Sequence, residues 1–123
     1  MAGSGTGGVE AGFNVNGTPS KYSIDAMYTN EQNKMTIKIN TAASGNPTFA
    51  NFHVHPKGRD GHNGSPSTPD NNSEGNKFGD TGYADKYGYQ VYVMSRFGLS
   101  MYDPKTKQTT QLRKGLDFLK PCP

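Results

Sequence analysis

Tryptophan is absent from this chain of 123 residues, and only 31% of its residues are hydrophobic. No apolar run approaches the roughly 20 residues that a membrane-spanning helix needs, so we expect no membrane partner. A basic start followed by an apolar stretch, the pattern of a signal peptide, is also missing. The length suits a single domain with a modest core, which its seven Tyr and six Phe can supply.

Cysteine and clustered charge are equally scarce. The single cysteine, Cys122, cannot form a disulfide within the chain and indicates no redox compartment. The net charge of +3 comes from Lys and Arg that are scattered along the chain. Nucleic-acid binding usually requires a basic cluster, so we do not expect a nucleic-acid partner.

Glycine and proline, by contrast, are abundant, at 16 and 8 residues. The stretch "MAGSGTGG" predicts a flexible leader over residues 1–8, as in a module cut from a longer protein, and leaves 9–123 as the domain. Residues 56–79 are rich in Gly, Pro, Asn and Ser and predict a long polar loop. Loops of this length inside a compact domain are usually functional or disordered.

The remaining segments alternate apolar and polar residues with the period of strands, and one carries helix signals. We expect a turn at Asn16-Gly17, a short helix capped by Asp80 or Thr81 and ended by Gly88, and a terminal helix over 112–120. The predicted fold class is α+β, a mostly antiparallel or mixed sheet of five to seven strands with one or two short helices. The expected strands cover residues 9–17, 21–29, 34–40, 48–55, 89–95, 98–104 and 107–112.

The heptad "FHVHPKG" begins at Phe52 and contains two of the three histidines of the chain. Side chains alternate across a strand, so His53 and His55 face one side while Phe52 and Val54 face the other. Two imidazoles about 7 Å apart along the backbone can tilt onto one metal ion. They can equally be two surface histidines on an edge strand.

Other residues of the right chemistry follow and precede the histidines. Catalytic zinc usually takes three protein ligands, histidines and a carboxylate, and keeps one position open. "SPSTPD" offers Ser67 and Asp70, and Asp80 opens the predicted helix. Glu10, on the first predicted strand, is a candidate general base.

Together these features resemble the JAMM (MPN-plus) metallopeptidases. "VEAGFNV" is similar to the strand that bears the family's glutamate, and "NFHVHPKG" to its His-x-His-Pro segment. "GYQVYVMSRFGLSMYDP" resembles the strand and hairpin that follow the metal aspartate, especially in the JAB-like domains at the C-termini of bacterial Rhs-type polymorphic toxins. The resemblance covers roughly residues 9 to 112 and implies a JAB/MPN (cytidine deaminase-like) architecture.

The resemblance also implies a function: a zinc-dependent hydrolase of peptide or isopeptide bonds, acting as a secreted bacterial effector. It implies Zn²⁺ as cofactor, a protein or peptide substrate and an immunity protein as partner. His53 and His55 would be zinc ligands, and the third would be Asp80, favoured by its place at a helix start, or Asp70, favoured by the Ser-x-x-Asp spacing. Glu10 would be the general base, with Glu31 second to it, and Ser67 would help to hold the carbonyl oxygen.

Two other functions remain open. "GRDGHNG" could serve a toxin nuclease of the ββα-metal type, with His62 as base and Asp60 or a nearby Asn helping to hold Mg²⁺. That interpretation requires a helix directly after His62, which the Gly, Pro and Asn content there disfavours. The other alternative is a catalytically silent JAB-like binding module that docks a partner through its Tyr-rich sheet.

Overall fold

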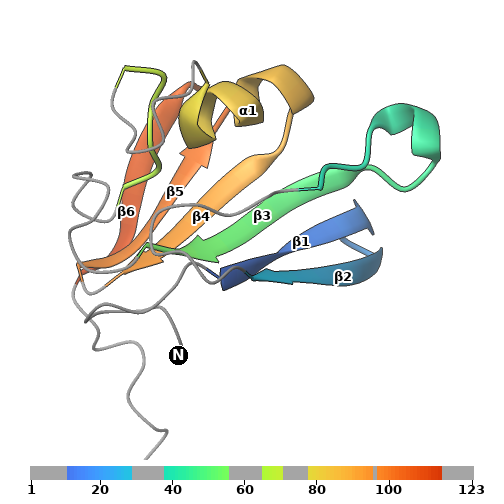
Figure 1. Cartoon of the computed structure of the whole chain (residues 1–123), viewed down its shortest axis with the longest axis horizontal. Coiled ribbons are helices and arrows are strands. Elements are labelled where there is room, and N and C mark those ends of the chain that lie inside the picture. The colour runs from blue at the N-terminus through green and yellow to red at the C-terminus, as the bar shows by residue number, and fades with distance from the viewer. Residues whose placement is uncertain (1–10, 29–37, 56–64, 71–77, 96, 115–123) are drawn as a thin grey trace, which may run out of the picture.

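One sheet of six strands carries a single α-helix on one face in the computed structural model (Figure 1), which describes residues 11–28, 38–55, 65–70, 78–95 and 97–114. The strand order is β2-β1-β3-β4-β5-β6, and every neighbouring pair is antiparallel except β3 and β4, which are parallel. This confirms the predicted α+β class with a mixed sheet. The elements are β1 (Ala11–Thr18), β2 (Lys21–Tyr28), the 3-10 turn η1 (Ala42–Ser44), β3 (Thr48–Val54), α1 (Gly79–Tyr87), β4 (Gln90–Ser95), β5 (Gly98–Asp103) and β6 (Gln108–Lys114).

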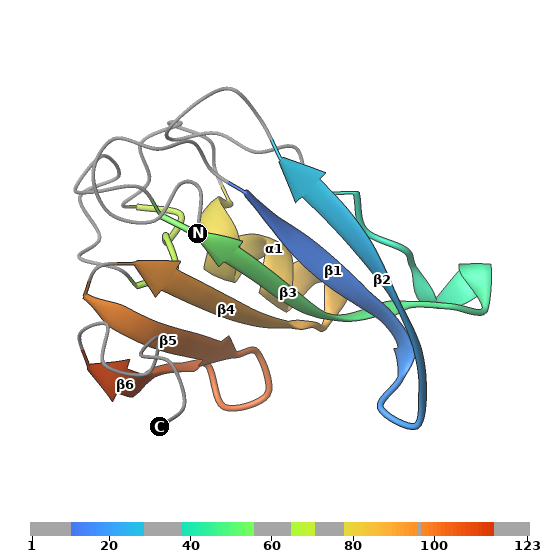
Figure 2. The ribbon, with the colours of Figure 1, turned by 90° about the horizontal axis from the view of Figure 1, so that it is seen from below.

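The parallel pair β3 and β4 lies at the centre of the sheet, and the chain between these strands includes α1. Figure 2, seen from below, shows α1 behind the strands, so the helix covers one face of the sheet. In sheets with parallel strands, ligand sites form beyond the carboxyl ends of the strands. The carboxyl end of β3, which carries His53 and is followed by His55, is a position of this kind.

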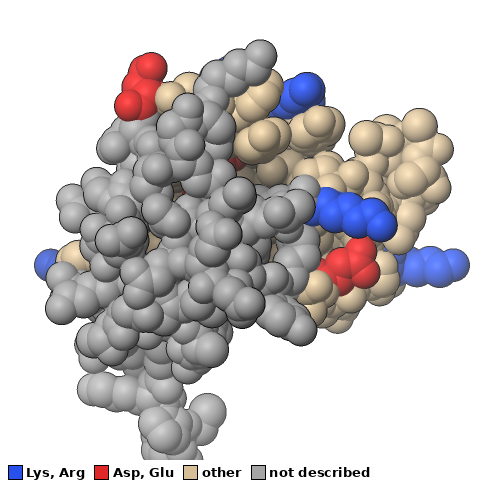
Figure 3. Space-filling model, in the orientation of Figure 1, with Lys and Arg blue, Asp and Glu red and all other residues tan. Residues whose placement is uncertain are grey.

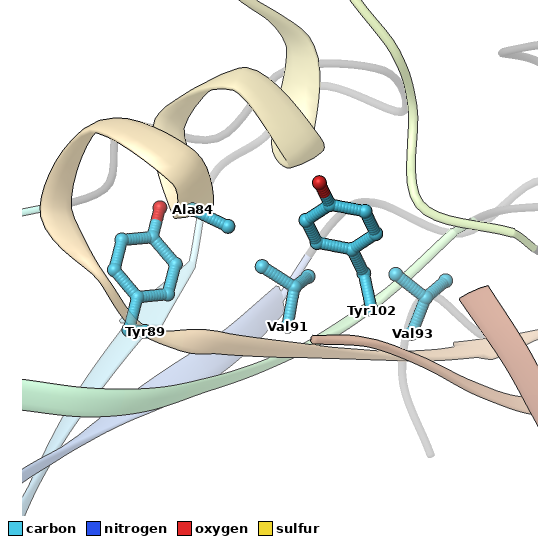
Figure 4. Close-up of a cluster of buried hydrophobic side chains, with 5 residues drawn as sticks. All are labelled: Ala84, Tyr89, Val91, Val93 and Tyr102. Atoms are coloured by element: carbon cyan, nitrogen blue, oxygen red, sulfur yellow. The ribbon is translucent and has the colours of Figure 1, made fainter. Parts of the chain in front are cut away.

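The apolar core lies between α1 and the strands β4 and β5. Val91 and Val93 are almost completely buried and rise from β4 toward the helix (Figure 4). Ala84 on α1 is fully buried and faces these valines. Its small side chain lets the helix lie close to the sheet. Each buried valine contributes about 1.5–3 kcal/mol relative to an exposed one. Tyr89 and Tyr102 complete the cluster.

The opposite face of the sheet carries a row of stacked aromatic rings. Phe13, Phe52 and Tyr92 lie on three adjacent strands, with ring centroids 4.9 Å and 4.3 Å apart. Such cross-strand aromatic pairs stabilise a sheet and fix its register. The register therefore places Phe52 on this face and leaves His53 on the face with α1, as the alternation predicts.

Three predicted local features are wrong. The first turn falls at residues 19–20, because Asn16 and Gly17 continue β1: Asn16 bonds to Asp25, and the Gly17 N–H donates to Pro47 O at 2.8 Å. The helix α1 has Phe78 as its N-cap, and neither Asp80 nor Thr81. The predicted terminal helix began at Leu112, but Leu112 lies in the strand β6, which continues to Lys114, and is 36% exposed.

Other predictions fall partly or wholly outside the described residues. The leader 1–8, most of the expected strand 34–40 and the end of the expected helix 112–120 lie there, whereas residues 38–40 are described and form no strand. The predicted strand 21–29 is confirmed as β2, which pairs with β1 and ends at Tyr28. The strands β3 to β5 and the cap at Gly88 are confirmed as well. Gly88 has a φ of 78° and donates its N–H to Ala84 O, as a left-handed helix end requires. The helix that the structure describes is too short and polar to cross a membrane.

Because of Tyr102, we expect the free energy of unfolding of the domain to fall at alkaline pH. Burial, and then the hydrogen bond that its hydroxyl donates to Asp85 Oδ1 at 2.8 Å, raise the pKa of Tyr102 to about 12. Since an unfolded tyrosine loses its proton near pH 10, the unfolded state binds fewer protons between about pH 10 and 12. Tyr102 alone therefore lowers the free energy of unfolding by about 2 kcal/mol over this interval.

Denaturant titrations at pH 9 and 12 measure this change. Tyr102→Phe should make the fall smaller, with a remainder from Tyr89, whose pKa burial also raises. Tyr22→Phe is the matched control, because Tyr22 is 60% exposed. An equal fall in the wild type and Tyr102→Phe would contradict this account.

Candidate metal site

Two buried histidines stand at the end of β3. His53 is 3% exposed and His55 is 4% exposed, although imidazoles are seldom fully buried. The parallel pairing with β4 fixes both: His53 pairs with Val93, and the His55 N–H donates to Met94 O at 2.9 Å. The two side chains therefore lie on the same face of a central strand, with their Nε2 atoms 3.0 Å apart. They are not ordinary surface histidines on an edge strand.

Gly12, on β1, pairs directly with His53. A Cβ atom at this position would lie 2.1 Å from Phe52 O and 2.7 Å from His53 Cβ. The glycine therefore lets β1 approach the strand that carries the histidines.

The carboxylate of the group comes from the first turn of α1. Asp80 Oδ2 lies 3.3 Å from His53 Nε2 and 3.3 Å from His55 Nε2. A negative side chain in the first helical turn is also favoured by the helix dipole. The structure thus brings together the two histidines and Asp80, which sequence reasoning favoured over Asp70 on account of the helix start.

Ser67 holds the loop against the start of this helix by three hydrogen bonds. Its N–H donates to Asp80 Oδ2 at 3.0 Å, and its hydroxyl accepts from the Asp80 N–H at 2.9 Å. Its carbonyl accepts from the Thr81 N–H at 2.9 Å. Ser67 thereby satisfies N–H groups that a helix start leaves unpaired, a role that a capping side chain usually has.

Gly79 makes this close approach possible. It has a φ of 64°, and a Cβ atom there would lie 2.5 Å from Thr68 O. Asp70 lies in the same loop but is exposed, and it is not part of the group of possible metal ligands among the described residues. The Ser-x-x-Asp spacing therefore misleads: the partner of Ser67 is Asp80, 13 residues further on.

The charge of the site lowers the pKa of Asp80. Burial alone would raise it, but His53, and then His55, stabilise the carboxylate when their imidazoles are protonated and so hold the pKa of Asp80 well below its usual range. Asp80 therefore carries a negative charge at neutral pH, as a metal ligand must.

His53, His55 and Asp80 form a group that could hold a metal ion. Two imidazoles and a carboxylate suit zinc, and zinc with tetrahedral bonds of about 2.0–2.1 Å places its ligand atoms roughly 3.3–3.4 Å apart. The separations of 3.0, 3.3 and 3.3 Å are close to the edges of such a tetrahedron. Among the described residues, these three side chains fit a zinc ion and would leave one of its four positions open.

Several predicted site residues lie outside the described part of the chain: Glu10 and Glu31 as bases, and Asp60 and His62 as nuclease residues. The described residues that follow His62, 65–70, form a bend, a bridge and a turn and no helix. On the face in Figure 3, the described Lys and Arg side chains are scattered and form no basic patch. The helix that the nuclease interpretation requires is therefore not found in the described residues 65–70.

Sequence reasoning missed Asn51 and Asn14, which are fully buried. Asn51 Oδ1 lies 2.6 Å from His53 Nδ1, and Asn51 in turn donates to Asn14 Oδ1 at 2.7 Å. Strand alternation could have placed Asn51 beside His53, two residues away on the same face. The position of Asn14 depends on the pairing of β1 with β3, which no local pattern specifies.

No protein-family model matches the chain, and no curated protein or solved structure matches it significantly. What the fold and the site define is a small α+β domain with a candidate metal centre. The centre lies where the central parallel strand β3 ends and the helix α1 begins.

Proposed function

We propose that this domain is a zinc-dependent hydrolase that cleaves peptide or isopeptide bonds. The observation that carries the proposal is the triangle of His53 Nε2, His55 Nε2 and Asp80 Oδ2, with separations of 3.0 to 3.3 Å. Three protein ligands of this kind leave one position open, as in catalytic zinc sites, whereas structural sites are closed by four. The JAMM-like order of glutamate, His-x-His-Pro, serine and aspartate supports the assignment.

In this proposal, His53, His55 and Asp80 bind the ion and fix its place at the end of β3. When bound, zinc supplies Lewis acidity, which polarises a carbonyl group and makes water a better nucleophile near neutral pH. Glu10 takes a proton from the attacking water and passes it to the leaving amine. Glu10 is the chain neighbour of Ala11, where β1 begins, and Gly12 pairs with His53.

Ser67 has two roles in the proposal. Its backbone N–H and its hydroxyl oxygen orient Asp80. Because the hydroxyl accepts the Asp80 N–H with a lone pair, its own hydrogen can be donated to the oxygen of the substrate carbonyl as negative charge develops there. The substrate class is a protein or peptide, and the role as a toxin-associated effector with an immunity protein rests on the sequence resemblance.

Hydrolysis of a panel of peptides and isopeptide-linked protein pairs tests the proposal. We expect cleavage that a chelator abolishes and that stoichiometric zinc restores. His55→Ala should lack this activity at every zinc concentration. Zinc binding without cleavage of any such bond, or cleavage that resists the chelator, would contradict the proposal; a chain with neither metal nor activity would be a binding module.

A further inference from the structure

A chain of hydrogen bonds runs through the buried polar part of the sheet and ends at His53. Asn14 Nδ2 donates to the backbone carbonyl of Lys38 at 2.7 Å. Asn51 Nδ2 donates to Asn14 Oδ1 at 2.7 Å, and Asn51 Oδ1 lies 2.6 Å from His53 Nδ1. Asn14 and Asn51 are both 0% exposed.

The first member of this chain determines the direction of all the others. A backbone carbonyl can only accept, so the atom of Asn14 that faces Lys38 O must be its amide nitrogen. Asn14 then presents its oxygen to Asn51, so Asn51 must donate from its own amide nitrogen. Asn51 therefore presents its oxygen, an acceptor, to the imidazole.

An acceptor at 2.6 Å requires that His53 Nδ1 carries a proton. In the neutral ring the other nitrogen, Nε2, then has a lone pair. Nε2 is the atom that lies 3.3 Å from Asp80 Oδ2 and 3.0 Å from His55 Nε2. The chain of amides thus aims a lone pair at the centre of the proposed metal site.

We propose that Asn51 is a positioning residue that holds His53 in its Nδ1-protonated tautomer and so presents Nε2 to the metal ion. This inference rests on the proposed zinc site and deepens it. Asn14 and the carbonyl of Lys38 act through Asn51, because their hydrogen bonds keep the Asn51 amide from rotating by half a turn. A hydrogen bond from the far nitrogen of a metal-binding imidazole fixes the ring and strengthens it as a ligand.

The cost of burying these amides supports a specific role. Buried amides are unfavourable unless each donor and acceptor is paired, and apolar strand residues would fill the same space without that requirement. Asn16 provides the contrast: it is also buried on the same face of β1, but its amide bonds to Asp25 and Thr48 and not to this chain. Asn16 is therefore a matched control.

Zinc affinity, measured by competition with a chromophoric chelator, tests the proposal in the full chain. Asn51→Leu should bind zinc about 10–100-fold more weakly than the wild type, as losses of such outer partners do. Asn16→Leu should stay within about threefold of the wild type. Asn51→Asp keeps an oxygen that accepts the Nδ1 proton but loses the amide donor to Asn14, so its zinc affinity should lie between those of the wild type and Asn51→Leu.

Long-range ¹H–¹⁵N NMR of the metal-free wild type at mildly alkaline pH reads the tautomer directly and needs no variant. We expect the proton of His53 on Nδ1, and a shift toward the Nε2-protonated form in folded Asn51→Leu. A wild-type proton on Nε2, or equal zinc affinities of wild type and Asn51→Leu, would overturn the role of Asn51 and leave the zinc site standing. Failure of the wild type to bind zinc would overturn both.

Discussion

Replacing Asp80 with asparagine is expected to weaken zinc binding by more than about 100-fold, because losing even an outer partner of a ligand costs 10–100-fold. The amide keeps the shape of the side chain and an oxygen that can accept the Ser67 N–H. It removes the negative charge that His53 and His55 stabilise. The change therefore isolates the contribution of the carboxylate to the metal site.

Asp70→Asn is the matched control, since Asp70 is the rival ligand from the Ser-x-x-Asp spacing but is exposed. It should bind zinc like the wild type. Both variants should be checked for folding by thermal unfolding without metal before titration with zinc. The reverse result, tight binding by Asp80→Asn and loss in Asp70→Asn, would refute the assignment of the third ligand.

Glu10→Gln should lower the turnover number by about 10²–10⁴-fold, the usual contribution of a general base. Its zinc affinity should stay within a factor of about three, because the proposal gives Glu10 no bond to the metal. This separation of binding from turnover is the specific prediction for a base. It is measured by peptide hydrolysis and zinc titration on the same preparation.

Glu31→Gln is the control for this second prediction, because Glu31 is the other glutamate considered as a base. It should keep nearly full activity. If Glu31→Gln loses turnover and Glu10→Gln keeps it, the base is assigned to the wrong residue. If Glu10→Gln loses zinc, Glu10 belongs to the metal site.

The elements around the site could be predicted because they depend on local patterns. Strand alternation placed Phe52 and His53 on opposite faces, and it made β4 the clearest strand of the chain. A helix start indicated Asp80 as the better partner for the histidines. These are short-range signals that a single sequence carries.

The features that could not be predicted depend on contacts between distant segments. Asn16-Gly17 is a strong turn signal, yet Asn16 pairs with Ser23 of β2 and Thr48 of β3, so the strand continues through it. Ser67 caps α1 from 13 residues away, so no capping residue was needed at Phe78. Asn14 and Asn51 gain their role only once β1 lies beside β3.

The aromatic row on the other face illustrates the same limit. Phe13, Phe52 and Tyr92 read individually as core residues, and their stacking follows only from the strand order β1-β3-β4. That order includes one parallel pair, joined across α1, in an otherwise antiparallel sheet; the sequence predicted a mostly antiparallel or mixed sheet but not which strands are parallel. The same parallel pair creates the position at which the histidines meet Asp80.

The central claim is that a pair of buried imidazoles and one helix-borne carboxylate share a divalent cation. Elemental analysis of the untagged chain, loaded with zinc and dialysed against metal-free buffer, tests it most directly. We predict one zinc per chain in the wild type and in Asp70→Asn, and none in His53→Ala. A folded wild-type chain that retains no zinc, or that retains as much after His53→Ala, would contradict the claim.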